Sequence, residues 1–223
     1  MSQVVCMSTC LETLLERKQD YNDFFNAIEY SVDKLYPDST PVLGMGSGAD
    51  SGTIAAALWT LGKPFDLVCV EGNENLDVLY DRLDIMGKRA IIIPPLSNME
   101  IDSTYDVMGQ MGYTKGRGTG IGTALSHFVL ASHTPNRHLY SGLGNDEFYT
   151  GNFQLFSRFM FRSNPSYRHF NINTIFPLLE PEVFVEYYCL DPQLRVYYKQ
   201  PFLEYMKSKN FPADDTKKNF TVK

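Results

Sequence analysis

The stretch PVLGMGSGADSGTIAAALWTL at residues 41–61 decides the fold, because it joins a short apolar run to a helical pattern through a glycine-rich loop. Residues 41–45 predict a buried strand, and residues 51–61 predict a helix. A loop between a strand and a helix binds anions, since its free backbone N–H groups and the helix dipole favour negative charge. We therefore expect an anion site at residues 46–51.

The loop at residues 46–51 is neither a Walker A loop nor a dinucleotide fingerprint. It lacks the lysine of the first, and its glycines do not follow the GxGxxG spacing of the second. Asp50 is unusual here, because a carboxylate repels phosphate unless a cation lies between them. Mg²⁺ is the natural bridge, since it binds carboxylate and phosphate oxygens together. A tight turn in which Asp50 only caps the helix explains the loop equally well.

Strand and helix patterns alternate on both sides of this loop. Further strands are predicted at residues 66–70, 89–93 and 138–141. Helices are predicted at residues 22–36, 76–86, 119–133, 147–162, 181–189 and 200–208. Residues 96–118 show no regular pattern, and a loop of this length is typically functional or mobile, so Met108, Met111 and Tyr113 are candidates for a lid. After residue 164 the sheet pattern stops.

This alternation predicts an α/β fold with a parallel sheet, right-handed crossovers and helices on both faces. Such sheets bind ligands beyond the carboxyl ends of their strands, where the strand order reverses. The glycine-rich loops at residues 46–51 and 142–146 both follow strands, so we expect them to share one crevice. The domain is predicted at residues 22–209, with an N-terminal extension at 1–21 and a polar C-terminal tail at 210–223 that frays.

Composition narrows the class of protein. A chain of 223 residues suits one α/β domain, and its net charge of −6 argues against general binding to nucleic acid or anionic membranes. Arg158, Arg162 and Arg168 leave a local basic patch open, so nucleic acid is not excluded. There is no apolar run long enough for a bilayer and no signal peptide in the first 18 residues. We expect a cytoplasmic protein without membrane association, and its oligomeric state stays open.

Four segments together resemble one known family. GSGADS at residues 46–51 resembles the SGGxDS loop of the ATP pyrophosphatase (PP-loop) superfamily, and SGLGNDE at 141–147 is similar to the SGEGADE segment of asparagine synthetases. FPLLEPEVFVE at 176–186 is similar to that family's PFLDxxVVEFA segment, and KQPFL at 199–203 to its lysine-bearing KxLLR segment. The resemblance covers roughly residues 25–206, which is the synthetase domain, and implies an adenine nucleotide alpha hydrolase-like (HUP, Rossmann-like) sandwich.

The resemblance implies an ATP-dependent, amide-forming ligase of the kind used in amino-acid biosynthesis. A carboxylate is activated as acyl-AMP with release of pyrophosphate, and an amine then displaces AMP. By motif match, Asp50 and Asp146 hold Mg²⁺, and Lys199 neutralises the charge that develops in both steps. The residues implied to bind ATP and pyrophosphate are Gly46, Ser47, Gly48, Asp50, Ser51, Gly142 and Gly144. A solvated lysine at a helix end, and an aspartate that caps a helix at residue 147, are the structural alternatives for Lys199 and Asp146.

Three departures from the family bear on the substrates. Gly46 and Ser47 stand in the reverse of the family's order, which alters the loop. Leu143 replaces the glutamate that lies beside the amino-acid substrate in asparagine synthetases, and this argues against aspartate as the acid. Ser2 stands where the family's glutaminase domain has its cysteine nucleophile. We therefore expect nitrogen from free ammonia, from a glutaminase partner, or from a second substrate that carries its own amine.

Two other functions fit the sequence. The first is a nucleotide-binding or regulatory module that kept the fold and lost turnover, which the altered loop and Leu143 suggest. The second is another PP-loop enzyme that modifies a nucleotide or a nucleic-acid base, although the absence of a CxxC pair argues against sulfur transfer. On either reading, tyrosines could line the substrate side of the crevice, although packing is their default role. These are Tyr187, Tyr188, Tyr197 and Tyr198.

Overall fold

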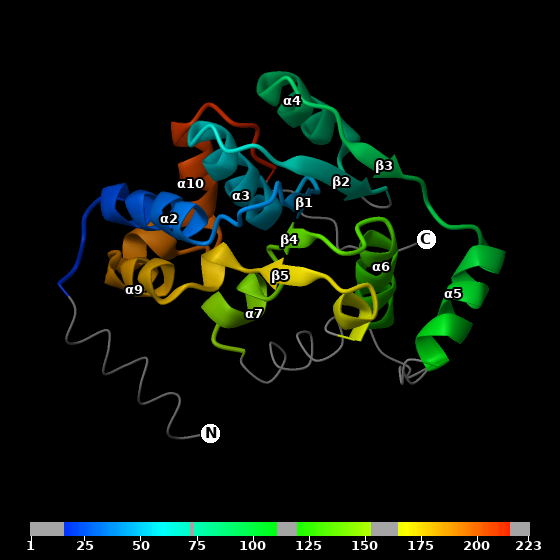
Figure 1. Cartoon of the computed structure of the whole chain (residues 1–223). Helices are drawn as coiled ribbons and strands as arrows, with labels where there is room; N and C mark the ends of the chain where they lie inside the picture. Colours follow the sequence, from blue (N-terminus) through cyan, green and yellow to red (C-terminus); the bar gives the residue numbers. More distant parts are fainter. Residues whose placement is uncertain (1–15, 72–73, 111–119, 153–164, 215–223) are drawn as a thin grey trace.

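The structure, a computed structural model, describes residues 16–71, 74–110, 120–152 and 165–214. Its centre is a sheet of five parallel strands in the order β3-β2-β1-β4-β5 (Figure 1). The strands are β1 (Val42–Gly44), β2 (Asp66–Val70), β3 (Ile91–Ile93), β4 (His138–Tyr140) and β5 (Asn173–Ile175). The predicted α/β fold with a parallel sheet is confirmed, and the architecture is Rossmann-like.

Side chains alternate across the sheet and bury both of its faces. In β2, Leu67 and Cys69 belong to one hydrophobic cluster, whereas Val68 and Val70 belong to the other. Helices cover the two faces (Figure 1). The first cluster packs against α2 (Asn22–Lys34), α3 (Ala49–Thr60), α4 (Leu76–Met86), α9 (Pro181–Cys189) and α10 (Gln200–Ser208), and the second against α5 (Asn98–Gln110) and α6 (Gly120–Ser132).

The order of the strands creates the crevice that the sequence predicts. From β1 the chain runs outward through α3 to β2 and through α4 to β3, and it then crosses the other face through α5 and α6 to reach β4. The reversal therefore lies between β1 and β4, which are direct neighbours. Open α/β sheets bind ligands at such a switch point, beyond the carboxyl ends of the strands.

One prediction fails at residues 96–118, because α5 occupies Asn98–Gln110. The helix begins with a reciprocal cap: Ser97 N donates to Glu100 Oε2 at 2.8 Å, and Glu100 N donates to Ser97 Oγ at 3.4 Å. This Ser-x-x-Glu pattern satisfies two backbone donors that helix ends leave free. Met108 is buried against the sheet, so it does not belong to a lid, and Met111 and Tyr113 lie outside the described residues.

A second prediction fails after residue 164, because β5 extends the sheet there. His138 pairs with Asn173 and Tyr140 with Ile175 in parallel register. A three-residue strand that contains Asn and Thr is too short to show an apolar pattern. The helix predicted at 147–162 also begins earlier, as α7 (Asn145–Tyr149), and residues 153–164 lie outside the described part of the chain.

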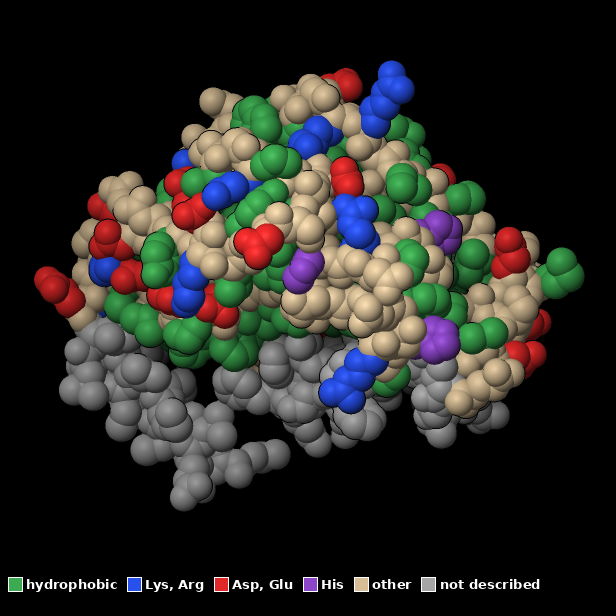
Figure 2. Space-filling view, viewed as in Figure 1, with side chains coloured by type: hydrophobic (Ala, Val, Ile, Leu, Met, Phe, Trp, Pro, Cys, Tyr) green, Lys and Arg blue, Asp and Glu red, His purple; other side chains and the backbone are tan. Residues whose placement is uncertain are grey.

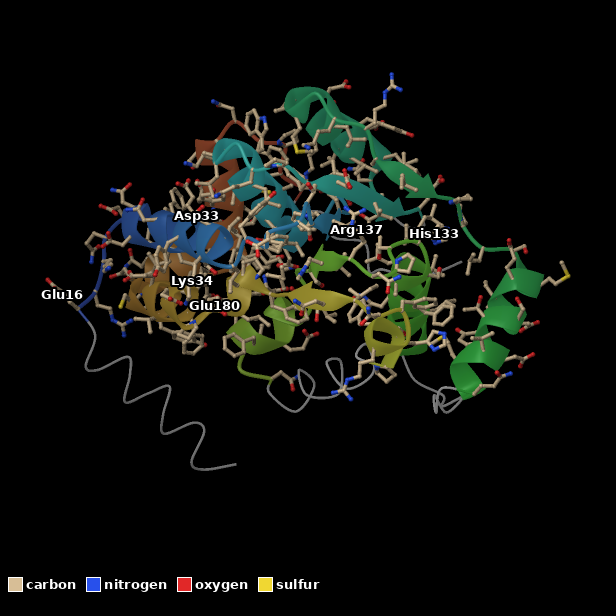
Figure 3. All side chains as sticks on the ribbon, viewed as in Figure 1. Glu16, Asp33, Lys34, His133, Arg137 and Glu180 are labelled. Carbon is tan, nitrogen blue, oxygen red and sulfur yellow. The ribbon has the colours of Figure 1, made fainter. Side chains whose placement is uncertain are left out.

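The described ends of the chain pack on the domain. Lys18 forms a parallel bridge with Leu190, and its Nζ contacts Glu186 Oε2 at 2.5 Å. Phe211, in the predicted tail, is buried against Trp59. Acidic and basic side chains are mixed on the face shown in Figure 2. Among them Lys34 and Glu180, labelled in Figure 3, form an ion pair of 3.0 Å. Within the described ranges, no helix is long and apolar enough to cross a membrane.

Candidate active site

Three residues predicted from separate motifs meet at the switch point. Lys199 Nζ lies 2.8 Å from Asp50 Oδ2 and 2.6 Å from Asp146 Oδ1. Asp50 lies in the first turn of α3, Asp146 in the first turn of α7, and Lys199 directly before α10. The two glycine-rich loops therefore lie side by side, as expected, and the third motif adds its lysine to the same place.

Lys199 is a buried cation and not a solvated lysine at a helix end. Its side chain is 3% exposed. Burial alone would lower the pKa of its ammonium group, but the negative charges of Asp50 and Asp146 raise this pKa above its ordinary value. The ammonium group also lies 5.6 Å from the centre of the Tyr198 ring. The site thus contains a permanent positive charge held between two carboxylates.

The segment after β4 approaches the first loop closely. A Cβ added at Gly142 would lie 2.6 Å from Asp50 Cβ and 3.1 Å from the Asp50 carbonyl carbon, so only glycine fits there. Gly144 has a left-handed backbone (φ 90°) and precedes α7. Because Gly144 is the N-cap residue, the alternative that Asp146 caps this helix is wrong. Asn145 Nδ2 lies 3.4 Å from Asp50 Oδ1 and ties the two loops together.

The first loop is held in shape by its own residues. Gly46 N donates to Ser51 Oγ at 3.1 Å. Gly48 is the N-cap residue of α3, so Asp50 does not cap this helix either. An added Cβ at Gly48 would meet no atom within 4 Å, which leaves open space at that position. Ser47 donates from its backbone N at 2.5 Å and from Oγ at 2.7 Å to Glu74 Oε2.

Two charged residues of this site were missed in the sequence. Glu74, between β2 and α4, places its carboxylate on Ser47, and nothing in its spacing indicates this contact. Arg82 of α4 is fully buried behind the loop. A signal for Arg82 exists, because it lies three residues after Leu79 and directly before Leu83, on the apolar face of the predicted helix.

The oxygen atoms of the cluster are of the kind that could hold a magnesium ion. Among the described residues, no group of three or more His, Cys, Asp or Glu side chains is placed to hold a metal. Mg²⁺, however, commonly uses one or two carboxylates and takes its other ligands from phosphate and water. Asp50 and Asp146 supply that pair. Asn145 Oδ1, which is buried and has no hydrogen-bond partner within the described residues, adds a neutral oxygen.

The candidate tyrosines divide into packing and crevice residues. Tyr187 is 2% exposed and packs against Phe24 and Phe202, so it belongs to the core. Tyr198 contacts the ammonium group of Lys199, and its neighbour Tyr197 is 39% exposed.

Arg158 and Arg162 of the candidate basic patch lie outside the described residues.

The fold and the site together define a Rossmann-like α/β protein with a lysine–aspartate cluster at the switch point of its sheet. No protein-family model matches this chain, and no curated protein matches it. The geometry of the cluster and of the two loops is therefore the basis for a functional proposal.

Proposed function

We propose that this chain is an ATP-dependent, amide-forming ligase similar to the synthetase domain of asparagine synthetases. It activates a carboxylate as acyl-AMP, releases pyrophosphate, and joins the acyl group to ammonia or another amine. The proposal rests on one observation: Lys199 lies between Asp50 and Asp146, beside the glycine-rich loop at residues 46–51. We place this activity in the cytoplasm, where ATP and Mg²⁺ are available.

The residues of the crevice suit this chemistry. Asp50 and Asp146 would hold Mg²⁺, which when bound supplies charge neutralisation on the phosphate oxygens. The loop at residues 46–51 would hold pyrophosphate through its backbone N–H groups, with Ser51 Oγ fixing the turn at Gly46. Gly142 brings the second loop within contact distance of Asp50. Phosphoryl and adenylyl chemistry depends more on such positioning and charge than on a strong base.

Lys199 would act as an electrostatic residue. An ammonium group has three N–H donors, and two of them serve the carboxylates of Asp50 and Asp146. The third remains for an oxygen on which negative charge develops. Because the side chain is buried, its charge is poorly screened by water and acts more strongly than a surface lysine. A fixed cation of this kind stabilises both the adenylation and the amide-forming transition state.

Pyrophosphate exchange tests the proposal. With a panel of carboxylic acids and no amine, we expect acid-dependent exchange of labelled pyrophosphate into ATP. Asp50→Ala should abolish this exchange, whereas Asp66→Ala, which removes an exposed carboxylate paired with Arg137, should leave it intact. A chain that binds ATP but exchanges with none of the acids would not be a ligase.

A second candidate is a nucleotide-binding module without turnover. Lys199 pairs with both aspartates, and Glu74 accepts hydrogen bonds from Ser47, so the ammonium group and the three carboxylates of the site already have partners within the chain. Internal pairing of this kind favours a regulatory site, in which a bound nucleotide displaces these contacts and their release signals that the nucleotide is bound. Calorimetric ATP binding with no production of AMP from any acid and amine would support this candidate. Failure to bind ATP would exclude both functions.

A further inference from the structure

Arg82 is a charged side chain that the proposed reaction does not use, and among the described residues it is the largest side chain with no exposure to solvent. It extends from α4 toward the back of the loop at residues 46–51. Gly52, in the first turns of α3, makes room for it, since an added Cβ there would lie 2.6 Å from Arg82 Nη2. A buried guanidinium group is costly unless its donors are satisfied, so its position requires an explanation.

The donors of Arg82 are directed to neutral acceptors. Nη1 donates to Gly46 O at 2.5 Å and to Gly48 O at 3.2 Å, and Nε donates to Pro212 O at 2.9 Å. No carboxylate in the described part of the chain forms an ion pair with Arg82. Burial lowers the pKa of its guanidinium group to about 10, although Glu74 and Asp214 oppose this shift from a distance. At neutral pH the loop therefore lies on a buried positive charge without a direct counter-ion.

These contacts, together with the helical hydrogen bond from Gly52 N to Gly48 O at 3.2 Å, fix the direction of the loop's amide groups. In a trans peptide the C=O and N–H bonds point in opposite directions. Because the carbonyls of Gly46 and Gly48 point at Arg82, the N–H groups of Ser47 and Ala49 point away from it. The carboxylate of Glu74 accepts from the N–H of Ser47, so the side of the loop opposite Arg82 already receives a negative group.

We infer that Arg82 is a positioning residue for the pyrophosphate site. Its Nη1 group binds the carbonyls of Gly46 and Gly48 and holds both peptide planes so that their N–H groups face the anion. Its charge adds attraction from behind the loop. Donors that are fixed before the ligand arrives need no reorganisation, which is the source of strong electrostatic stabilisation in active sites. This inference rests on the proposed function, because it takes the anion to be the pyrophosphate group of ATP.

Arg82→Lys tests the role, because lysine keeps the charge and loses the planar guanidinium group, which is held by Pro212 O at Nε while Nη1 binds the two loop carbonyls. Binding of Mg²⁺-pyrophosphate is measured by calorimetry, and binding of adenosine, which lacks phosphate, by saturation-transfer NMR. We expect pyrophosphate affinity to fall about 10- to 100-fold, as is usual when a supporting partner of a ligand site is lost. Adenosine affinity should stay within about twofold of wild type. Arg89→Lys, an exposed arginine just after α4, is the matched control.

The two affinities together distinguish a positioning role of Arg82 from a general structural role. Equal loss of both affinities, or an unchanged pyrophosphate affinity, would overturn the inference while leaving the ligase proposal in place. If Arg82→Lys fails to fold, Gly52→Ala gives the same comparison, since it keeps the arginine and displaces its guanidinium group. A wild-type chain that binds neither pyrophosphate nor adenosine would end both proposals.

Discussion

At the scale of single residues, the cluster at the switch point depends on charge compensation. Asp50 and Asp146 come from different helices, and without Lys199 their partly buried carboxylates would lie close together with no cation between them. Breaking a buried ion pair by removing one partner costs more than the pair contributes, because an uncompensated charge stays behind. Lys199 therefore serves the fold of the free protein as well as the proposed chemistry.

The first prediction concerns Lys199→Met. We expect the free energy of unfolding to fall by about 1–3 kcal/mol, because two partly buried carboxylates lose their cation. Mg²⁺ should restore part of this loss, since it can take the place of the ammonium group. Thermal denaturation with and without Mg²⁺ measures both effects. Lys207→Met, at an exposed pair with Glu204, should cost less than about 1 kcal/mol. Equal losses in the two variants would contradict a compensating role for Lys199.

The second prediction concerns Glu74→Gln. The carboxylate of Glu74 occupies the N–H and hydroxyl donors of Ser47, so it competes with any anion that binds there. A hydrogen bond to a charged group contributes about 1.5–3 kcal/mol, so its weakening should tighten pyrophosphate binding by about tenfold or more. Calorimetry against Glu71→Gln, in the same loop, gives the comparison. Weaker binding would show instead that Glu74 holds the loop in its binding shape.

Motifs predicted the residues that meet, but not how they meet. Asp50, Asp146 and Lys199 stand in short segments with a recognisable order, so the sequence indicates a shared site. The contacts of Glu74 and Arg82 depend on how α4 packs behind the loop at residues 46–51. Local sequence patterns do not indicate this tertiary arrangement. The apolar spacing around Arg82 is a signal of its burial that was missed, and no pattern indicates that its partners are carbonyl groups.

At the scale of elements, strong patterns predicted the fold and weak ones failed. Residues 66–70, 76–86, 181–189 and 200–208 form the predicted strand and helices with the same bounds. These segments have clear apolar periodicity or a proline at the helix start. The missed β5 has three residues, and the missed α5 is exposed over most of its length, so neither offers a continuous apolar face. Their positions come from tertiary pairing and from capping.

The third prediction tests the cap of α5. Ser97→Ala removes the hydroxyl that exchanges hydrogen bonds with Glu100, so we expect a loss of about 0.5–2 kcal/mol in stability. Hydrogen exchange should increase across residues 98–110. Ser103→Ala is the control, because Ser103 Oγ bonds only the helix backbone at Glu100 O and alanine favours helices. Equal protection in both variants would mean that packing alone forms α5.

At the scale of the whole molecule, the two faces of the sheet have different roles. The face covered by α3, α4 and α10 positions the cluster at the switch point. The opposite face holds a polar pair in an apolar cluster, where Tyr167 Oη lies 2.5 Å from His127 Nδ1. Desolvation lowers the pKa of His127 to about 4. This second face therefore links the stability of the fold to pH, at a distance from the proposed chemistry.

The fourth prediction follows from His127. Its pKa is lower in the folded chain than the ordinary value of 6.5, so the unfolded chain binds more protons between about pH 4 and 6.5. Stability should therefore fall as pH decreases through this window, by at most about 1.4 kcal/mol per pH unit. His127→Gln, which keeps an acceptor for Tyr167, should flatten the dependence, and the exposed His169→Gln should not. Denaturation at several pH values measures this, and identical curves would exclude His127 as the cause.

The fifth prediction concerns the boundary of the domain. The sequence predicts a fraying tail from residue 210, yet Phe211 is 3% exposed and packs on Trp59, with the guanidinium carbon of Arg82 5.7 Å from its ring centre. Phe211→Ala should therefore cost about 3–5 kcal/mol, as for a core phenylalanine. It should also weaken pyrophosphate binding, because it removes the Phe211 ring that packs against the guanidinium group of Arg82. Tyr80→Ala, an aromatic residue 49% exposed on α4, should change stability by less than about 0.5 kcal/mol. If denaturant titration gave the two variants equal stability, the domain would end before Phe211 and the support for Arg82 would lie elsewhere.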